Sequence, residues 1–184
     1  MSPQNMAASV KARLHNTARE SGQAFAELLQ LYTMERFLYR LSQSDHADKF
    51  VLKGALLFMV WKSAYQRRTT LDIDLLGFTD NTIDNLEGIA KELCGQETED
   101  DGLSFDADSV RTERIKEDAD YEGIRTKLFG YLERSRVQVQ IDIGFGDALV
   151  PEPVPATMPT ILDFPAPELN CYHQLTVIAE SLKP

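Results

Sequence analysis

The chain has 184 residues, of which 43% are hydrophobic and 26% charged, the balance of an ordinary folded protein. This length supports one domain with a substantial core and excludes a small scaffold held together by disulfides. The net charge of −10 argues against a protein that coats nucleic acid with a broad basic surface.

Neither the cysteines nor the N-terminus indicates a secreted or membrane protein. Cys94 and Cys171 have no CxxC spacing and no histidine cluster beside them, which argues against a zinc site or a disulfide framework. The N-terminus lacks the apolar core of a secretory signal, and no run of 18 apolar residues occurs. We therefore expect a cytoplasmic protein with no membrane partner.

The first half of the chain alternates helices and short strands. Residues 5–18 are helix-like, and a break at Ser21 and Gly22 precedes apolar residues spaced by three and four, which predict a long amphipathic helix from Phe25. "KFVLKG" predicts a short strand that ends at Gly54. The almost wholly apolar run "ALLFMVWKSAY" then predicts a buried helix.

The middle of the chain adds further strands and one helix. A strand is expected from about Leu71 to Leu76, and a helix that Asp80 or Thr82 caps is expected to end at Gly95. Residues 103–115 and 122–133 carry weaker strand patterns. "RVQVQIDIG" alternates apolar and polar residues cleanly, which predicts a strand with one buried face.

The last part of the chain is rich in proline over residues 150–168, which predicts an extended loop with one edge strand at "TILDF". "LNCYHQLTVIAESLKP" then predicts a closing helix. This order of elements predicts an α/β (α+β) domain with a mixed β-sheet flanked by helices, and a doubly wound parallel sheet is the less favoured alternative.

The stretch "TTLDIDLLG" carries two carboxylates within a strand. The strand period of two places Asp72 and Asp74 on one face, where like charges repel unless a cation lies between them. Mg²⁺ prefers carboxylate oxygens, water and substrate phosphates, so the pair indicates metal-assisted nucleotidyl or phosphoryl transfer. The alternative is a half-exposed strand with two solvated aspartates and no such role.

The surroundings of this pair favour the first interpretation. Gly54 lies between a strand and a helix, where free backbone N–H groups can hold a phosphate. The order strand, glycine, helix and DxD strand is the layout of a polymerase-beta-like nucleotidyltransferase core. Asp142, on the polar face of a later strand, is the candidate third carboxylate, as a metal ligand or as a base toward the acceptor hydroxyl.

Several basic residues are candidates for binding the nucleotide phosphates. Guanidinium and ammonium groups match phosphate charge, and the alternative for each is an ordinary surface position. In addition to the backbone N–H groups of Gly54 and Ala55, the candidates are Lys53, Arg67, Arg68, Arg125 and Lys127.

Four runs together resemble the AbiEii/AbiGii toxin family of nucleotidyltransferases, over roughly residues 10–182. They are "ERFLYRLSQSDHADKFVLKGALLFMVW", "RRTTLDIDLLG", "YEGIRTKLFGYL" and "VQIDIGFGDALVPEP". The resemblance implies a bacterial toxin of a toxin–antitoxin or abortive-infection system with a cognate antitoxin. It also implies transfer of a nucleotide from an NTP to an acceptor, tRNA in some members.

Two positions depart from the pattern of that family. Gly54 is followed by Ala55 where Gly-Gly or Gly-Ser is expected, and "VIAESL" has Ser181 after Glu180 where the family has a lysine. We expect one domain over residues 1–184, with N-terminal helices in 1–45, a catalytic core in 46–184 and no C-terminal helical region. The departures leave open an inactive relative that binds nucleotide or antitoxin. An NTP-dependent phosphotransferase is a further alternative, because the same metal geometry would serve it.

Overall fold

A computed structural model describes residues 3–57, 60, 72–118, 121–146 and 152–173. The elements in chain order are α1 (Pro3–Ser21), α2 (Phe25–Gln43), the 3₁₀ turn η1 (Ala47–Lys49), β1 (Phe50–Lys53), β2 (Asp72–Gly77), α4 (Ile83–Cys94), β3 (Leu103–Asp118), β4 (Tyr121–Leu132), β5 (Ser135–Gly144), β6 (Val154–Thr157) and β7 (Glu168–Cys171).

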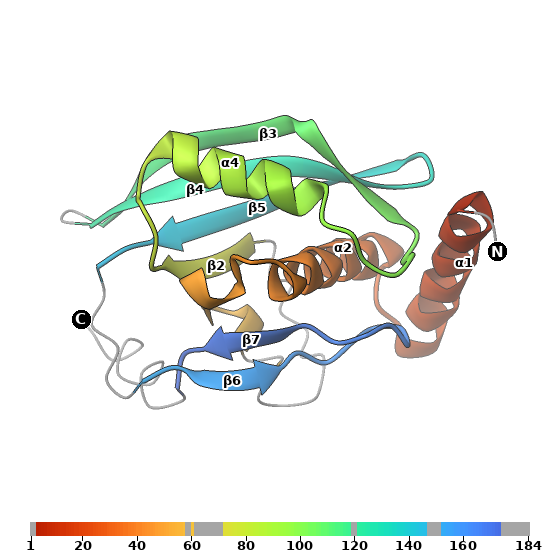
Figure 1. The fold of residues 1–184 in the computed structure, drawn as a ribbon. Helices are drawn as coiled ribbons and strands as arrows, with labels where there is room; N and C mark the ends of the chain where they lie inside the picture. Colours follow the sequence, from red (N-terminus) through yellow and green to blue (C-terminus); the bar gives the residue numbers. More distant parts are fainter. Residues whose placement is uncertain (1–2, 58–59, 61–71, 119–120, 147–151, 174–184) are drawn as a thin grey trace.

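The strands form one mixed sheet in the order β3-β4-β5-β2-β1-β7-β6 (Figure 1). The pairs β2–β5 and β1–β7 are parallel, and the other neighbours are antiparallel. Helices α2 and α4 pack on the sheet, α4 against β3 and β4 and α2 against β5 and β7. The predicted mixed sheet flanked by helices is therefore confirmed.

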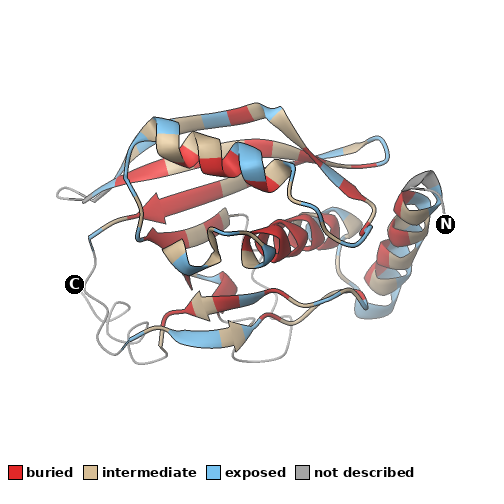
Figure 2. Cartoon of the chain, viewed as in Figure 1, coloured by how far each residue is buried: buried red, intermediate tan, exposed pale blue. Residues whose placement is uncertain are grey.

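The periodicity of the sequence accounts for the core beneath these helices. In β5, Val137, Val139, Ile141 and Ile143 are buried, as their alternation with polar residues predicted. Helix α4 begins where expected, because the side chain of Thr82 accepts a hydrogen bond from the Asn85 backbone N–H at 3.3 Å. Figure 2 shows the buried residues concentrated in α2 and the central strands.

The predicted edge strand at "TILDF" is wrong, because residues 160–164 form no strand. The edge strand in this part of the sequence is β6, whose one partner among the described strands is β7, with Pro155 opposite Asn170. A strand at the edge of a sheet needs hydrogen-bond donors on one side only. Proline, which has no N–H, is therefore tolerated in β6.

The prediction of a closing helix over residues 169–184 is wrong for its first residues, which form a strand. Glu168–Cys171 form β7, which continues the sheet beside β1, and the Tyr172 N–H donates to the Leu52 carbonyl at 3.0 Å. Leu169 and Cys171 are both buried, which is the period of a strand. Residues 174–184, with Glu180 and Ser181, lie outside the described residues.

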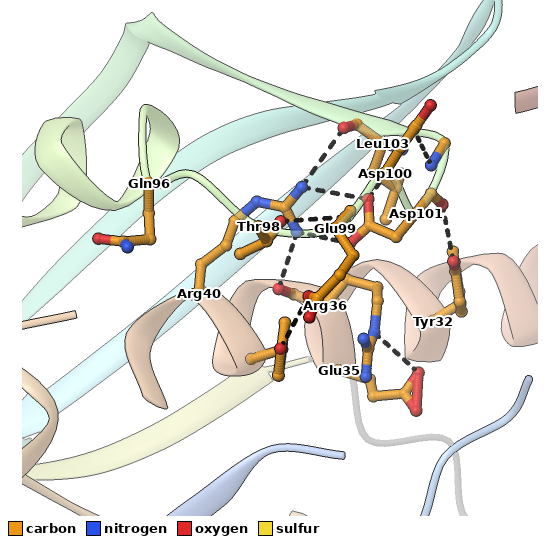
Figure 3. Close-up of polar contacts among 12 residues, drawn as sticks. Tyr32, Glu35, Arg36, Arg40, Gln96, Thr98, Glu99, Asp100, Asp101 and Leu103 are labelled. Carbon is orange, nitrogen blue, oxygen red and sulfur yellow. Dashed lines mark hydrogen bonds and ion pairs between the residues drawn. The ribbon is translucent and has the colours of Figure 1, made fainter. Parts of the chain in front are cut away.

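Helix α2 is more deeply buried than an amphipathic helix should be. Every residue from Leu31 to Leu41 is buried, including Glu35, Arg36 and Arg40. Figure 3 shows how these charged side chains reach other segments, and the Arg40 guanidinium donates to both Asp101 carboxylate oxygens at 2.8 and 3.1 Å. Helix α2 thus holds the segment before β3 through a buried ion pair.

A second set of contacts joins α2 to the segment before β7. Nη2 of Arg36 donates to the Pro165 carbonyl at 2.6 Å, and Oε1 of Glu35 accepts from the Ile161 N–H at 3.0 Å. Within the part of the chain that the structure describes, Glu35 Oε2 and Arg36 Nε make no hydrogen bond and lie 3.6 Å apart. Glu35 is therefore a buried carboxyl with one poorly satisfied oxygen.

This environment predicts a pH-dependent contribution of Glu35 to stability. Burial raises the pKa of Glu35 from 4.5 to about 7 against the opposing charge of Arg36. The folded state then holds the proton more tightly than the unfolded state, so the stabilisation is complete below pH 4.5 and is lost as the pH rises through 7. We expect the advantage of the wild type over Glu35→Gln, measured by urea unfolding, to shrink by up to about 3 kcal/mol between those limits. A difference that stays constant with pH would contradict this assignment.

No helix among the described residues is both long and apolar enough to cross a membrane.

Candidate active site

The middle of the sheet brings the predicted carboxylates together. In the parallel pair β2–β5, Asp74 lies opposite Asp142, and Asp72 lies opposite Gln140. Ile73 and Leu75 of β2 are buried, whereas Asp72 and Asp74 are partly exposed. Both aspartates therefore lie on the face opposite the apolar residues, as the strand period predicted.

The charges around Asp72 show how close these groups are. Burial raises the pKa of Asp72, and the charge of Asp142 raises it further. Arg125 and Lys127 oppose this shift and lower the pKa of the Asp72 carboxyl. A cation bound beside Asp72 would oppose this shift and stabilise the ionised Asp72 carboxylate.

Gly54 lies directly against Asp74. Its φ is +75°, and a Cβ built on it would lie 2.2 Å from Oδ2 of Asp74 and 2.8 Å from the Asp74 Cβ. The residues after it begin a helix, since the Leu57 N–H donates to the Gly54 carbonyl at 3.2 Å. The turn after β1 thus packs on the Asp74 side chain, with Lys53 opposite Asp74 in the β1–β2 register.

The sequence indicated Gly54 as a backbone position near a phosphate, but it did not reveal this contact. A glycine before a helix is explained equally well by a turn, and only the pairing of β1 with β2 places it against Asp74. Gly54 is therefore needed for two reasons, its left-handed backbone and the space that the carboxylate occupies.

Asp142 is bound by an arginine on the neighbouring strand. Nε and Nη2 of Arg125 donate to Oδ1 and Oδ2 of Asp142 at 2.8 and 2.7 Å. The sequence patterns predicted separate roles for these two residues, and the pair itself was not predicted. Because Leu132 and Ser135 face each other across a two-residue turn, counting outward along β4 and β5 places Arg125 opposite Asp142.

The remaining basic candidates divide into two groups. Lys127 is partly exposed on the same face and lies opposite Gln140 in the β4–β5 register, and Lys53 is partly buried beside Gly54. Arg67 and Arg68 lie outside the described residues.

The donor set suits a hard divalent cation that keeps part of its shell for substrate. No three His, Cys, Asp or Glu side chains converge on one point in the described ranges. Asp72 and Asp74 nevertheless offer two carboxylates on one face of a rigid strand. Mg²⁺ fits such a pair, because it usually retains waters and binds one or two carboxylates together with substrate phosphates.

The comparison with protein families agrees with this geometry. The family model of the nucleotidyl transferase AbiEii toxin of type IV toxin–antitoxin systems matches residues 36–182. The chain belongs to the AbiEii family. The match spans β1, the turn after it, β2, β4 and β5, which together carry all the described candidate residues. The predicted resemblance is therefore confirmed.

One solved structure agrees with the fold of this AbiEii-family chain. A Helicobacter pylori protein described as a "putative nucleotidyltransferase" has 18% identity and a TM-score of 0.50, over 84% of this chain and 57% of its own. JHP933 from Helicobacter pylori has 17% identity and a TM-score of 0.49, over 85% of this chain and 56% of its own. This chain thus spans little more than half the length of either protein. No curated protein matches the sequence.

Proposed function

We propose that this AbiEii-family chain is a nucleotidyltransferase toxin that moves a nucleotide from an NTP to an acceptor, tRNA, in the cytoplasm. The proposal includes Mg²⁺ as cofactor, a cognate antitoxin as partner and a role in abortive infection. One observation carries it: the Gly54 turn packs directly on Asp74 of the DxD strand, beside Asp72.

The roles of the residues follow from charge and position. Asp72 and Asp74 would hold the metal, which when bound neutralises the triphosphate charge and orients the reacting phosphate. The backbone N–H groups at Gly54 and Ala55 would donate hydrogen bonds to a phosphate at the start of the following helix. Lys53 and Lys127 add positive charge beside the carboxylates, on β1 and β4.

The test is transfer of label from NTP to RNA. The purified chain is incubated with Mg²⁺, total tRNA and each of the four NTPs labelled at the α-phosphate. Wild type should label RNA, and Asp72→Asn or Asp74→Asn should lower the rate by on the order of 1000-fold, because catalysis here is positioning and charge stabilisation. Thermal unfolding checks that the variants fold.

The matched control is Asp80→Asn, which alters an exposed aspartate just after β2 and should leave transfer unchanged. Transfer that survives loss of either DxD carboxylate would refute the proposal. A parallel reaction uses NTPs labelled at the γ-phosphate, and label that reaches RNA only from the γ-phosphate would identify a phosphotransferase. Binding of NTP without any transfer would identify the inactive relative.

A further inference from the structure

The ion pair between Arg125 and Asp142 decides what the third carboxylate can do. Both oxygens of Asp142 accept hydrogen bonds from one guanidinium, at 2.8 and 2.7 Å, and the residue is 8% exposed. Bidentate pairs between arginine and carboxylate are short, charge-assisted and geometrically specific. The two Arg125 bonds and the contact of Gln140 Nε2 with Oδ2 at 3.5 Å take three of the roughly four lone-pair sites of the carboxylate, so a metal ion would compete with these partners for Asp142.

The same pair leaves several N–H donors of the Arg125 guanidinium available. A guanidinium has five N–H donors, and Asp142 takes one each from Nε and Nη2. Nη1 of Arg125 has no hydrogen bond to any of the described residues, and the side chain is 31% exposed. Asp142 therefore fixes one edge of the guanidinium and leaves the other edge available.

The available edge lies close to the DxD pair. Arg125 on β4 lies opposite Asp142 on β5, and Asp142 in turn lies opposite Asp74 on β2, so the three residues follow one another across adjacent strands. A triphosphate bound by a metal at Asp72 and Asp74 would bring its oxygens within reach of this edge. Arginine suits that task, because its planar fork matches phosphate and stays charged at every physiological pH.

We infer that Arg125 binds the nucleotide triphosphate and that Asp142 is a positioning residue for Arg125 and does not bind the metal. This inference rests on the proposed function, since it needs a metal-bound triphosphate at Asp72 and Asp74. It changes the role expected for Asp142 from the sequence: β4 supplies the phosphate-binding side chain, and β5 supplies the carboxylate that positions it.

The two roles of Asp142 predict different binding measurements without any turnover. Free Mn²⁺ is followed by electron paramagnetic resonance without nucleotide, and binding of each of the four NTPs is followed by calorimetry with Mg²⁺. Asp142→Asn should keep Mn²⁺ affinity within about threefold of wild type, because it removes no metal ligand. Asp142→Asn and Arg125→Gln should each weaken NTP binding about tenfold or more, the effect of losing hydrogen bonds to a charged group.

Three further variants separate this role from a merely structural one. The double variant Arg125→Gln/Asp142→Asn should bind NTP no worse than Arg125→Gln alone, because the two residues act as one unit. Arg125→Lys should restore binding only in part, since it keeps the charge and loses the fork. Glu113→Gln is the matched control, because Glu113 lies opposite Arg125 on the β3 side and should leave both affinities unchanged.

The outcomes distinguish this inference from the proposed function. Asp72→Asn should weaken Mn²⁺ binding more than tenfold, and if it does not, the metal site itself is wrong. If Asp72→Asn and Asp142→Asn weaken Mn²⁺ binding equally, Asp142 is a metal ligand and the inference fails while the proposed function stands. Unchanged NTP affinity in Arg125→Gln would also overturn the inference.

Discussion

Gly54→Ala is expected to lower nucleotidyl transfer by at least about 100-fold, because a displacement of about 1 Å at a reacting group has that effect. The new methyl group would lie 2.2 Å from Oδ2 of Asp74, so the carboxylate must move from its place beside Asp72. The residue would also adopt a φ of +75°, which alanine disfavours. Strain and crowding together should lower the free energy of unfolding by about 2–4 kcal/mol. Steady-state kinetics and urea unfolding measure the two effects.

Gly22→Ala is the matched control for the backbone strain that alanine experiences at a positive φ. Gly22 has a φ of +72°, and nothing lies within 4 Å of a Cβ built on it. It should therefore lose stability through strain alone, by about 1–2 kcal/mol, and keep full transfer activity. Equal activity in Gly54→Ala and Gly22→Ala would mean that the position of Asp74 does not matter for the reaction.

Arg40→Met is expected to be the most destabilising single change in α2. It would leave the Asp101 carboxylate, which is 2% exposed, buried without its charge partner (Figure 3). Removing one member of a buried ion pair typically lowers the free energy of unfolding by about 3–5 kcal/mol. Urea unfolding at neutral pH should show this loss as a lower midpoint with an unchanged slope.

A second variant tests whether the uncompensated charge is the cause. Arg40→Met/Asp101→Asn should be more stable than Arg40→Met alone, because the asparagine is neutral and can still accept the Leu103 N–H bond that Asp101 accepts at 3.1 Å. Lys91→Met, which breaks an exposed i,i+4 pair with Glu87, should change stability by less than about 0.5 kcal/mol. A loss in Lys91→Met as large as in Arg40→Met would show that burial of the pair has no effect.

The sequence predicted those helices and strands that have a regular spacing of apolar residues or that pair with a segment close by in the chain. The alternation in β5 and the helical spacing in α4 each determine a buried face without reference to the rest of the chain. The short strands β6 and β7 were not predicted, because they are stabilised by pairing with each other and, for β7, with β1. The paired residues Cys171 and Leu52 lie more than 100 residues apart in the sequence.

The candidate site shows the same division. The strand period placed Asp72, Asp74 and Asp142 on polar faces, and the structure confirms those faces. The contact of Gly54 with Asp74 depends on the β1–β2 register, which no local pattern reveals. The pairing of Arg125 with Asp142, in contrast, can be predicted from the sequence, by counting residues outward along both strands from the two-residue turn after Leu132.

The same holds for the buried charges of α2. A helix with apolar residues at regular spacing is expected to turn its charged residues to solvent, and Arg36 and Arg40 do not. Their partners, Pro165 and Asp101, lie 129 and 61 residues further along the chain. These partners could not be predicted from the sequence. Without a known partner, an arginine is expected at the surface, because burying an unpaired charge costs free energy.

The place of β2 in the sheet has a consequence for how the site responds to fluctuations. It is the fourth of seven strands, hydrogen-bonded to β1 on one side and to β5 on the other. Central strands open to solvent only in the rare events that unfold the whole domain, whereas edges fray easily. The two aspartates therefore keep their spacing while β6 and β3 open and close at the margins, so thermal motion at the periphery leaves the geometry of the reacting centre unchanged.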